Sequence, residues 1–276
     1  MRFLTDVFLR SKTPLVLAFC LMASVSGPLL IACGQAMPPT KSSLIFGDDF
    51  LGGQLDTNKW GTCYPWFDGT GCTNHGNPEL EWYLPGQVSV QGGALHLTAL
   101  RSGVRGFDSA KRPKDFPYRS GMVTTAGHFQ FTYGRVEFRA RAPRGRGLWP
   151  ALWLLSADGA GKPEIDLMEA YCEDVWQLIL TYHPKQGDPP QYIALVNDIS
   201  STWHTYALDW RPDSLIWYID GHRVFSADYD VPHQPMYLIA NLAVSGIPPH
   251  QPDASTPATA QFDIASVRVW ASSASA

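Results

Sequence analysis

The chain has 276 residues, of which 45% are hydrophobic and 12% aromatic, and its 25 acidic and 21 basic residues leave a formal net charge of −4. This near balance argues against nucleic acid as a partner and against binding to an anionic membrane surface through charge. The 24 glycines and 22 prolines are spread along the chain as turn signals, so they do not indicate low complexity. The length is enough for one large β domain or two small ones.

The N-terminal segment differs in kind from the rest of the chain. Three basic residues precede a mostly apolar stretch over residues 14–32, and no charged residue follows until Lys41. A positive region followed by an apolar region is typical of a secretory signal, which takes no part in the fold. We therefore predict a signal peptide over residues 1–33, followed by a short linker over 34–42.

The signal ends in LIAC, which resembles the bacterial lipobox and makes Cys33 the expected lipidated residue. The mature protein would then be attached to a membrane by its lipid without spanning it. The predicted location is the cell envelope, as a periplasmic or outer-membrane lipoprotein, or the extracellular space. Cleavage near Ala36 without lipidation and an uncleaved membrane anchor are the alternatives.

Three cysteines would remain beside the lipidated one. Cys63 and Cys72 lie nine residues apart across a glycine-rich loop, and in an oxidising compartment they are the natural disulfide pair. Cys172 would then be a buried free thiol.

Short alternating runs of apolar and polar residues fill the chain from Ser43 to Trp270, and almost none has a helical period. Asp220-Gly221 between two such runs indicates a tight hairpin turn. Many short strands at this spacing predict an all-β sandwich or barrel. Because no repeat or linker interrupts them, we predict one domain over residues 43–271 with a tail over 272–276.

The run LWPALWLL, residues 148–155, is apolar on both faces of a strand. One face carries Pro150, Leu152 and Leu154, and the other carries Trp149 and Trp153. The two tryptophans could form a second hydrophobic layer. Alternatively, their flat faces could stack on pyranose rings.

The run PEIDLMEAY, residues 163–171, places three acids in an apolar segment. On a regular strand Glu164 and Asp166 share a face, but Glu169 falls on the other one. A β-bulge at Leu167 or Met168 would return Glu169 to the face of the other two acids.

Three carboxylates on one apolar strand repel one another and lose hydration, so a structural role alone explains them poorly. Glycosidic bond cleavage gives two of them tasks, because it needs one ionised carboxylate and one carboxylic acid that donates a proton. The third can adjust the pKa values of the pair. The alternatives are a divalent-metal cluster, for which no nearby His or Asn has an obvious spacing, and a non-catalytic sugar-binding sandwich.

With these features, the sequence resembles the family-16 glycoside hydrolases, and in particular their laminarinase-like members. The catalytic signature E-[IL]-D-x-x-E is present over residues 164–169, and matching segments cover nearly the whole mature chain in order. These segments are DDFLGGQLDTNKW (48–60), NPELEWYLPGQVSVQGGALHLTA (77–99), YGRVEFRARAPRGRGLWPALWLL (133–155), WHTYALDWRPDSLIWYIDGHRVF (203–225), MYLIANLAVSG (236–246) and FDIASVRVW (262–270).

The resemblance implies a single-domain, concanavalin-like β-jelly-roll sandwich whose concave sheet forms an open polysaccharide cleft. It implies retaining, endo-acting chemistry in which Glu164 is the nucleophile, Asp166 the assisting acid and Glu169 the general acid/base. The one-residue bulge is a feature of this branch of the family. No cofactor is expected for catalysis.

The resemblance also implies substrate-binding residues around the acids. Trp149 and Trp153 would line the cleft, and His183 and Asn77 would contact sugar, although His183 could instead cap a loop and Asn77 could only shape its turn. Asp263 matches the position of an aspartate that helps to hold a structural calcium ion in many relatives. Asn241 is read as a buried hydrogen-bonding residue and is not included among the ligands.

The expected substrate is a β-glucan, cleaved at internal β-1,3 or mixed β-1,3/1,4 bonds by a monomeric enzyme. The rim segments 62–77, 184–191 and 245–259 match no member that we can name, and rim loops decide which linkage fits. A transglycosylase or a galactan hydrolase of the agarase or carrageenase type, with the same three acids, therefore remains an alternative.

Overall fold

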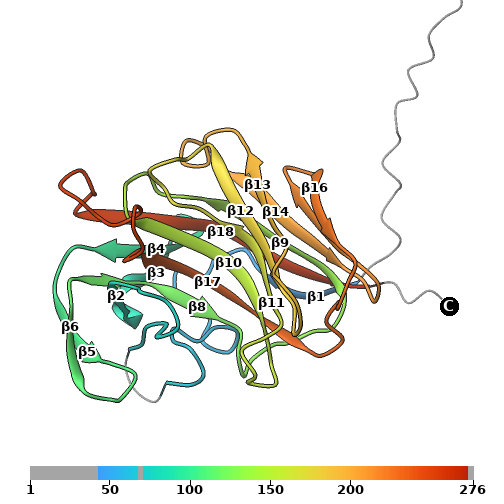
Figure 1. The fold of residues 1–276 in the computed structure, drawn as a ribbon, viewed down its shortest axis with the longest axis horizontal. Coiled ribbons are helices and arrows are strands. Elements are labelled where there is room, and N and C mark those ends of the chain that lie inside the picture. The colour runs from blue at the N-terminus through green and yellow to red at the C-terminus, as the bar shows by residue number, and fades with distance from the viewer. Residues whose placement is uncertain (1–42, 68–70, 273–276) are drawn as a thin grey trace, which may run out of the picture. The chain divides into compact units, whose positions relative to one another are not determined.

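Two mainly antiparallel sheets pack face to face in the computed structural model, which describes residues 43–67 and 71–272 (Figure 1). The prediction of an all-β sandwich is confirmed. The predicted signal peptide with Cys33, the linker over 34–42 and most of the tail lie outside the described residues. The predicted domain boundaries therefore stay a prediction.

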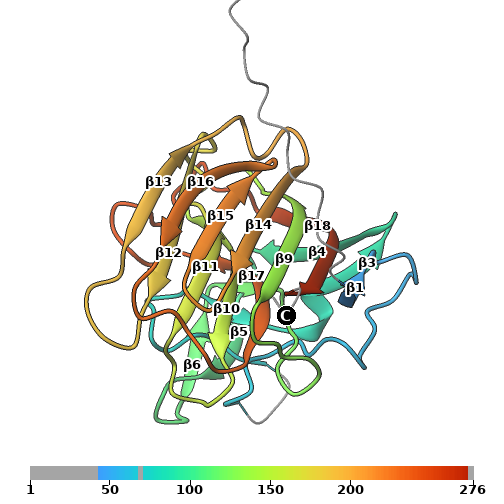
Figure 2. The same cartoon turned by 90° about the vertical axis from the view of Figure 1, so that its right-hand side faces the viewer.

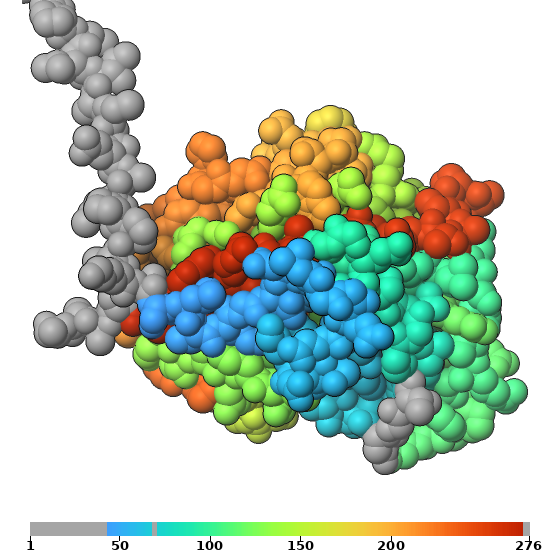
Figure 3. Space-filling view, turned by 180° about the vertical axis from the view of Figure 1, so that it is seen from behind, coloured from blue at the N-terminus to red at the C-terminus, as the bar shows by residue number. Residues whose placement is uncertain are grey.

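The larger sheet has ten strands within the described residues, and Figure 2 shows most of them side by side. Across the sheet the main path runs through β16 (His222–Ala227), β15 (Leu215–Ile219), β14 (His204–Trp210), β9 (Gly134–Arg141), β18 (Thr259–Ala271), β4 (Ala94–Leu100), β7 (Tyr118–Ser120) and β2 (Glu81–Tyr83). Two further strands pair with this path, β1 (Leu44–Asp48) with β18 and β3 (Val88–Gln91) with β4. Seen from behind, the residues of β1 lie along those of β18 (Figure 3).

The smaller sheet carries the acidic run and has six strands among the residues described. Its order is β13 (Gln191–Leu195), β12 (Gln177–His183), β11 (Glu164–Glu169), β10 (Leu148–Ser156), β17 (Met236–Val244) and β8 (Met122–Thr124). A separate hairpin and a single 3₁₀ turn complete the structure: β5 (Val104–Phe107), β6 (Pro113–Phe116) and η1 (Pro85–Gln87).

The core lies between the two sheets and is filled by every second residue of their strands. In β9, Val136 and Phe138 are fully buried, whereas Glu137 is half-buried and Arg139 is exposed on the outer face. Burying one such apolar side chain stabilises the fold by roughly 1.5–3 kcal/mol. The alternation that the sequence displays is thus the alternation between core and solvent.

Strand β10 is buried on both faces, as its sequence predicted. Its even-numbered residues face the core, while Trp153 on the other face packs in a smaller cluster with Tyr64 and Tyr83. This second apolar layer is covered by the segment that contains the Cys63–Cys72 disulfide, whose predicted pairing is confirmed. Cys172 is free and buried, also as predicted.

Candidate active site

The three acids of β11 share one face of the smaller sheet because the strand contains a bulge. Against β10, Asp166 pairs with Trp153 and Met168 pairs with Leu152, so Leu167 is the additional residue. Leu167 and Met168 both enter the core, at 2% and 0% exposure. The bulge expected from the parity of the acids is confirmed.

The bulge is held from the opposite sheet. The indole N–H of Trp217 in β15 donates a hydrogen bond of 2.8 Å to the backbone carbonyl oxygen of Asp166, next to the additional residue. Bulges disturb the ladder of backbone hydrogen bonds, and an unpaired buried carbonyl is costly. Trp217 therefore satisfies a backbone group at the irregular position.

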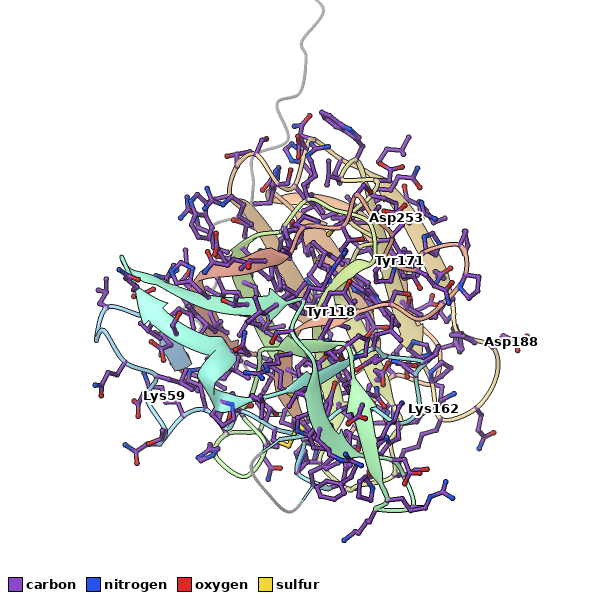
Figure 4. The ribbon with its side chains drawn as sticks, turned by 90° about the vertical axis from the view of Figure 1, so that its left-hand side faces the viewer. Lys59, Tyr118, Lys162, Tyr171, Asp188 and Asp253 are labelled. Carbon is purple, nitrogen blue, oxygen red and sulfur yellow. A yellow bond between two sulfur atoms is a disulfide. The ribbon has the colours of Figure 1, made fainter. Side chains whose placement is uncertain are left out.

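The acids line a cleft on the outer face of the smaller sheet. Glu164, Asp166 and Glu169 border one hollow together with residues of β10 and β17, and Glu164 also borders a second, larger hollow of about 550 Å³. Lys162 and Tyr171, which are labelled in Figure 4, lie just before and just after β11 and so mark its two ends. The three carboxyl groups thus face the space in which a ligand would lie.

Burial raises the pKa of all three acids, and repulsion by a neighbouring acid adds to this for Glu164 and Asp166. Burial, and then the Asp166 charge, raise the pKa of Glu164 from 4.5 to about 8. Burial and the Glu169 charge raise the pKa of Asp166 well above its usual value, and burial raises that of Glu169. The cluster therefore holds protons at neutral pH, and Asp166, only 4% exposed, is the acid that we expect to keep one.

His183 joins the acids from the neighbouring strand. It lies opposite Glu164 in the β11–β12 register, with Nε2 at 3.1 Å from Asp166 Oδ2 and 3.6 Å from Glu164 Oε1. The sequence spacing did not show this histidine as a partner of the acids, but the strand pairing brings it to them. His183 is the last residue of β12, and its contact with sugar stays a prediction.

These groups could hold a cation by their chemistry alone. The ligand atoms of Glu164, Asp166 and His183 lie within 4.8 Å of one another, which is the single such group in the part of the chain that the structure describes. However, the His183 ring nitrogen already lies at hydrogen-bonding distance from Asp166.

The two tryptophans of β10 line the cleft by their edges. The Trp149 N–H donates to Glu169 Oε1 at 3.0 Å, and the Trp153 N–H donates to Asn241 Oδ1 at 2.8 Å. Only 9% of Trp149 and 7% of Trp153 is exposed. Trp153 therefore forms the predicted second apolar layer, and stacking of either ring on a sugar stays a prediction.

Residues from the N-terminal part of the chain close the cleft. Asn77 is exposed at its edge and donates to Glu79 Oε1 at 3.3 Å. Glu79 and Asn241 also line the hollow; Glu79 was not predicted, whereas Asn241 was predicted only as a buried hydrogen-bonding residue, which is confirmed. Burial, and then the Glu81 charge, raise the pKa of Glu79 well above its usual value.

Asn241 links the second apolar layer to the cleft. Its amide nitrogen donates to the Tyr83 hydroxyl at 3.0 Å, while its oxygen accepts the Trp153 N–H, so both ends of this buried side chain are satisfied. The sequence signal for this hydrogen-bonding role is that Asn241 is the single polar residue of the apolar strand β17.

Asp263 does not fit a calcium site. Its Oδ1 lies 2.7 Å from His96 Nδ1, and its Oδ2 accepts a hydrogen bond of 2.7 Å from the Arg141 guanidinium. Calcium requires six to eight oxygen ligands, whereas here both carboxylate oxygens face nitrogen donors and one of these donors is always charged. The expectation for Asp263 is therefore corrected to an ion pair between β18 and β9.

A β-sandwich with carboxyl groups gathered in an open cleft defines the class of protein, since paired carboxyls are what glycoside-cleaving enzymes use. The sequence matches the model of the glycosyl hydrolases family 16 over residues 80–265. The chain belongs to this family, and its fold is the β-jelly-roll sandwich expected from the resemblance.

Individual relatives agree with this assignment. An endo-1,3-1,4-beta-glycanase, EglC, of Rhizobium meliloti (strain 1021) is 34% identical over 73% of this chain and 46% of its own length. The catalytic domain of a laminarinase from Thermotoga petrophila RKU-1 has 30% identity and a TM-score of 0.74, over 84% of this chain and 98% of that domain. A non-specific endo-beta-1,3(4)-glucanase crystallised with a glucan oligosaccharide has 26% identity and a TM-score of 0.72, over 85% and 96%. The chain thus spans less than half of the curated relative.

Proposed function

We propose that this protein is a retaining, endo-acting glycoside hydrolase that cleaves internal β-1,3 or mixed β-1,3/1,4 bonds of a β-glucan. The observation that carries the proposal is the bulge at Leu167, which gathers Glu164, Asp166 and Glu169 on the cleft face. The names of the similar proteins, an endo-1,3-1,4-beta-glycanase, an endo-1,3-beta-glucanase and an endo-beta-1,3(4)-glucanase, support the substrate class.

In the first step, a carboxylate oxygen of Glu164 forms a bond to the anomeric carbon while the bond to the leaving oxygen breaks. Glu169 gives its proton to that oxygen, and the fragment that carries this oxygen as a new non-reducing end leaves, while the fragment that will carry the new reducing end stays bound to Glu164. In the second step, water attacks the anomeric carbon of the glycosyl-enzyme ester, Glu169 takes a proton from the water, and Glu164 is released as a carboxylate.

Asp166 keeps the nucleophile ionised in this scheme. Its raised pKa keeps it protonated at neutral pH, so it can donate a hydrogen bond to Glu164. A protonated Asp166 also carries no charge, so it no longer contributes to raising the pKa of Glu164. His183, close to both groups, orients Asp166.

The test is the release of reducing ends from laminarin, lichenan and agarose by the full-length protein. We expect activity on laminarin or lichenan, β-configured first products by NMR, and a loss of more than about a thousandfold in kcat for Glu164→Gln. Glu137→Gln, on the outer face of the larger sheet, is the matched control. Activity on agarose alone, or products longer than the starting oligosaccharide, would point to the galactanase or to the transglycosylase.

We further propose that the chain is exported and carries a lipid on Cys33, as a monomeric cell-envelope or secreted protein. The Cys63–Cys72 disulfide supports an oxidising compartment. Among the described residues, no helix has the length and apolar character needed to cross a membrane. Labelling of cells with radioactive palmitate should mark the protein, and Cys33→Ser should abolish the label; an equally labelled variant would contradict the proposal.

A further inference from the structure

A second hollow, of about 490 Å³, lies beside the cleft and takes no part in the chemistry above. We call it the hairpin pocket, because one wall is the β5–β6 hairpin, which Figure 1 shows standing apart from the catalytic strands β10 and β11. The opposite wall comes from Trp82 of β2 and from Trp66, Phe67 and His75. Its volume is within the range of about 300–1,000 Å³ that ligand pockets have.

The walls of the hairpin pocket are aromatic. Trp82 forms the floor, with Phe67 at 5.7 Å and Phe107 at 6.3 Å between ring centroids, both edge-on. About half of Phe107 and half of Trp66 is exposed, at 49% and 51%. Because both rings line one pocket, they are candidate contacts for a ligand there.

Trp66 borders both the hairpin pocket and the cleft. Its ring lies on that of Tyr64, at 4.5 Å and 10° between planes, and Tyr64 in turn contacts Trp153 of the cleft at 6.2 Å. Trp66 lines both the hairpin pocket and the larger hollow that Glu164 borders. A chain that fills the cleft can therefore cross Trp66 and reach the hairpin.

The hairpin is positively charged, although the chain as a whole has a net charge of −4. Residues 104–116 carry four basic side chains against two acidic ones, 4 − 2 = +2, namely Arg105, Lys111, Arg112 and Lys114 against Asp108 and Asp115. Arg105 and Lys111 line the hairpin pocket itself.

The two acids of the hairpin pair with its basic side chains to different extents. Arg112 holds Asp108 at 2.8 Å, which neutralises the acid that faces the hairpin pocket. Arg105 lies 3.8 Å from Asp115, but both groups are more than two-thirds exposed, at 70% and 80%. Such a pair contributes at most about 1 kcal/mol, so Arg105 can exchange Asp115 for another anion.

The charges of the two regions are opposite, and this sets the orientation of a ligand. The cleft centre holds Glu164, Asp166, Glu169 and Glu79, and it would repel an acidic sugar. The hairpin pocket combines a guanidinium with aromatic rings, a pairing that suits a sugar ring carrying an anionic group.

We propose that the hairpin pocket binds an anionic sugar residue of the polysaccharide, one that carries a carboxylate or a sulfate group and lies away from the bond that is cleaved. The preferred substrate is then a glucan with acidic substituents or branches, with neutral residues at the catalytic acids. This proposal rests on the proposed function of the cleft.

The test measures binding to the full-length Glu164→Gln variant, which leaves the polymer intact, by calorimetry at low and high salt. The probes are laminarin and its carboxymethylated and sulfated derivatives of the same chain length. We expect a derivative to bind about three- to tenfold more tightly than laminarin at low salt, with the advantage lost at high salt, as for an exposed ion pair with an aromatic contact.

Two variants assign this advantage to the hairpin pocket. Arg105→Gln should remove the advantage of the anionic polymer, and Phe107→Ala should weaken its binding about threefold or more. Arg223→Gln, which replaces an exposed arginine on β16, should change neither affinity. The carboxymethylated and sulfated arms report which anion is preferred, and either preference supports the proposal.

Three results would overturn the proposal: equal affinity for laminarin and both derivatives, an advantage that survives Arg105→Gln, or an advantage that Arg223→Gln removes equally. Cleavage of laminarin by the unmutated protein tests the proposed function separately. If laminarin is not cleaved, the proposed function fails. Arg105-dependent binding of an anionic polymer would still support the hairpin pocket, and its absence would overturn it.

Discussion

The raised pKa of Glu164 predicts that the active site destabilises the fold at neutral and alkaline pH. Its pKa is 4.5 in an ordinary environment and about 8 in the folded protein. Between these values the native state binds more protons than the unfolded state, so the free energy of unfolding falls as the pH rises from about 4.5 to about 8. Glu164→Gln, which resembles the protonated acid, should lose this pH dependence.

The magnitude follows from the shift. A difference of 3.5 units, 8 − 4.5, corresponds to a ceiling of about 4.8 kcal/mol above pH 8, at 1.36 kcal/mol per unit. This ceiling includes the effect of the Asp166 charge, which a protonated Asp166 does not carry, and because 28% of the Glu164 side chain is exposed, water also screens part of its own charge. Glu164→Gln should raise the free energy of unfolding more at pH 8 than at pH 5. We expect the difference between these two gains to be about 2 kcal/mol, roughly half of the ceiling.

The assay is urea unfolding followed by tryptophan fluorescence, with the unmutated protein and both variants at pH 5 and pH 8. The matched control is Glu137→Gln, in which only an ion pair of 3.5 Å with Arg135 on the outer face is removed. Its effect should be below about 1 kcal/mol at both pH values. If Glu164→Gln is no more stabilising at pH 8 than at pH 5, the account of the acid cluster is refuted.

Three further predictions concern the surroundings of the acids. Trp149→Phe removes the N–H that stabilises ionised Glu169, so the pKa of Glu169 rises and the alkaline limb of kcat/KM should move up by about one pH unit; an unmoved limb would contradict the assignment of the acid. Asn241→Leu leaves the buried Trp153 N–H without its acceptor and should lower the free energy of unfolding by about 1–3 kcal/mol in urea titrations. An unchanged free energy of unfolding would show that the hydrogen bond between Trp153 and Asn241 does not stabilise the fold. Treatment with EDTA should leave the rate on laminarin unchanged, and a loss restored by a divalent cation would favour the metal alternative.

Much of the fold could be predicted from the sequence because alternation is a local property. In β9, the separation of Val136 and Phe138 from Glu137 and Arg139 is visible in the residues and is preserved in the sandwich. The bulge could also be predicted, since three acids with one task must share a face. The sequence limited its position to Leu167 or Met168, and the choice of Leu167 depends on the pairing with β10.

The partners of the acids depend on register between strands, which the sequence does not display. His183 is separated from Asp166 by 17 residues and reaches it only because it lies opposite Glu164 on β12. The sequence did not show the partners of Asp263 for the same reason. The strand pairing brings Arg141 and His96 to its carboxylate, where a calcium ligand was expected.

Glu79 and Glu81 could have been found from the sequence. They stand two apart in NPELEWY, between apolar residues, which is the same anomaly that identified Glu164 and Asp166. In the structure both are buried, at 6% and 0% exposure, and Glu79 borders the cleft. In such a chain, an acid within an apolar strand is a candidate functional residue.

The central claim is that Glu164 attacks the sugar and Glu169 donates the proton. Its most direct test is intact-protein and peptide mass spectrometry after incubation with a 2-deoxy-2-fluoro-β-laminaribiosyl fluoride, which slows the second step and lets the ester accumulate. We expect one added glycosyl group, located on Glu164. A label on Glu169 would contradict the assigned roles, and no label with α-configured first products from laminarin would contradict the retaining mechanism.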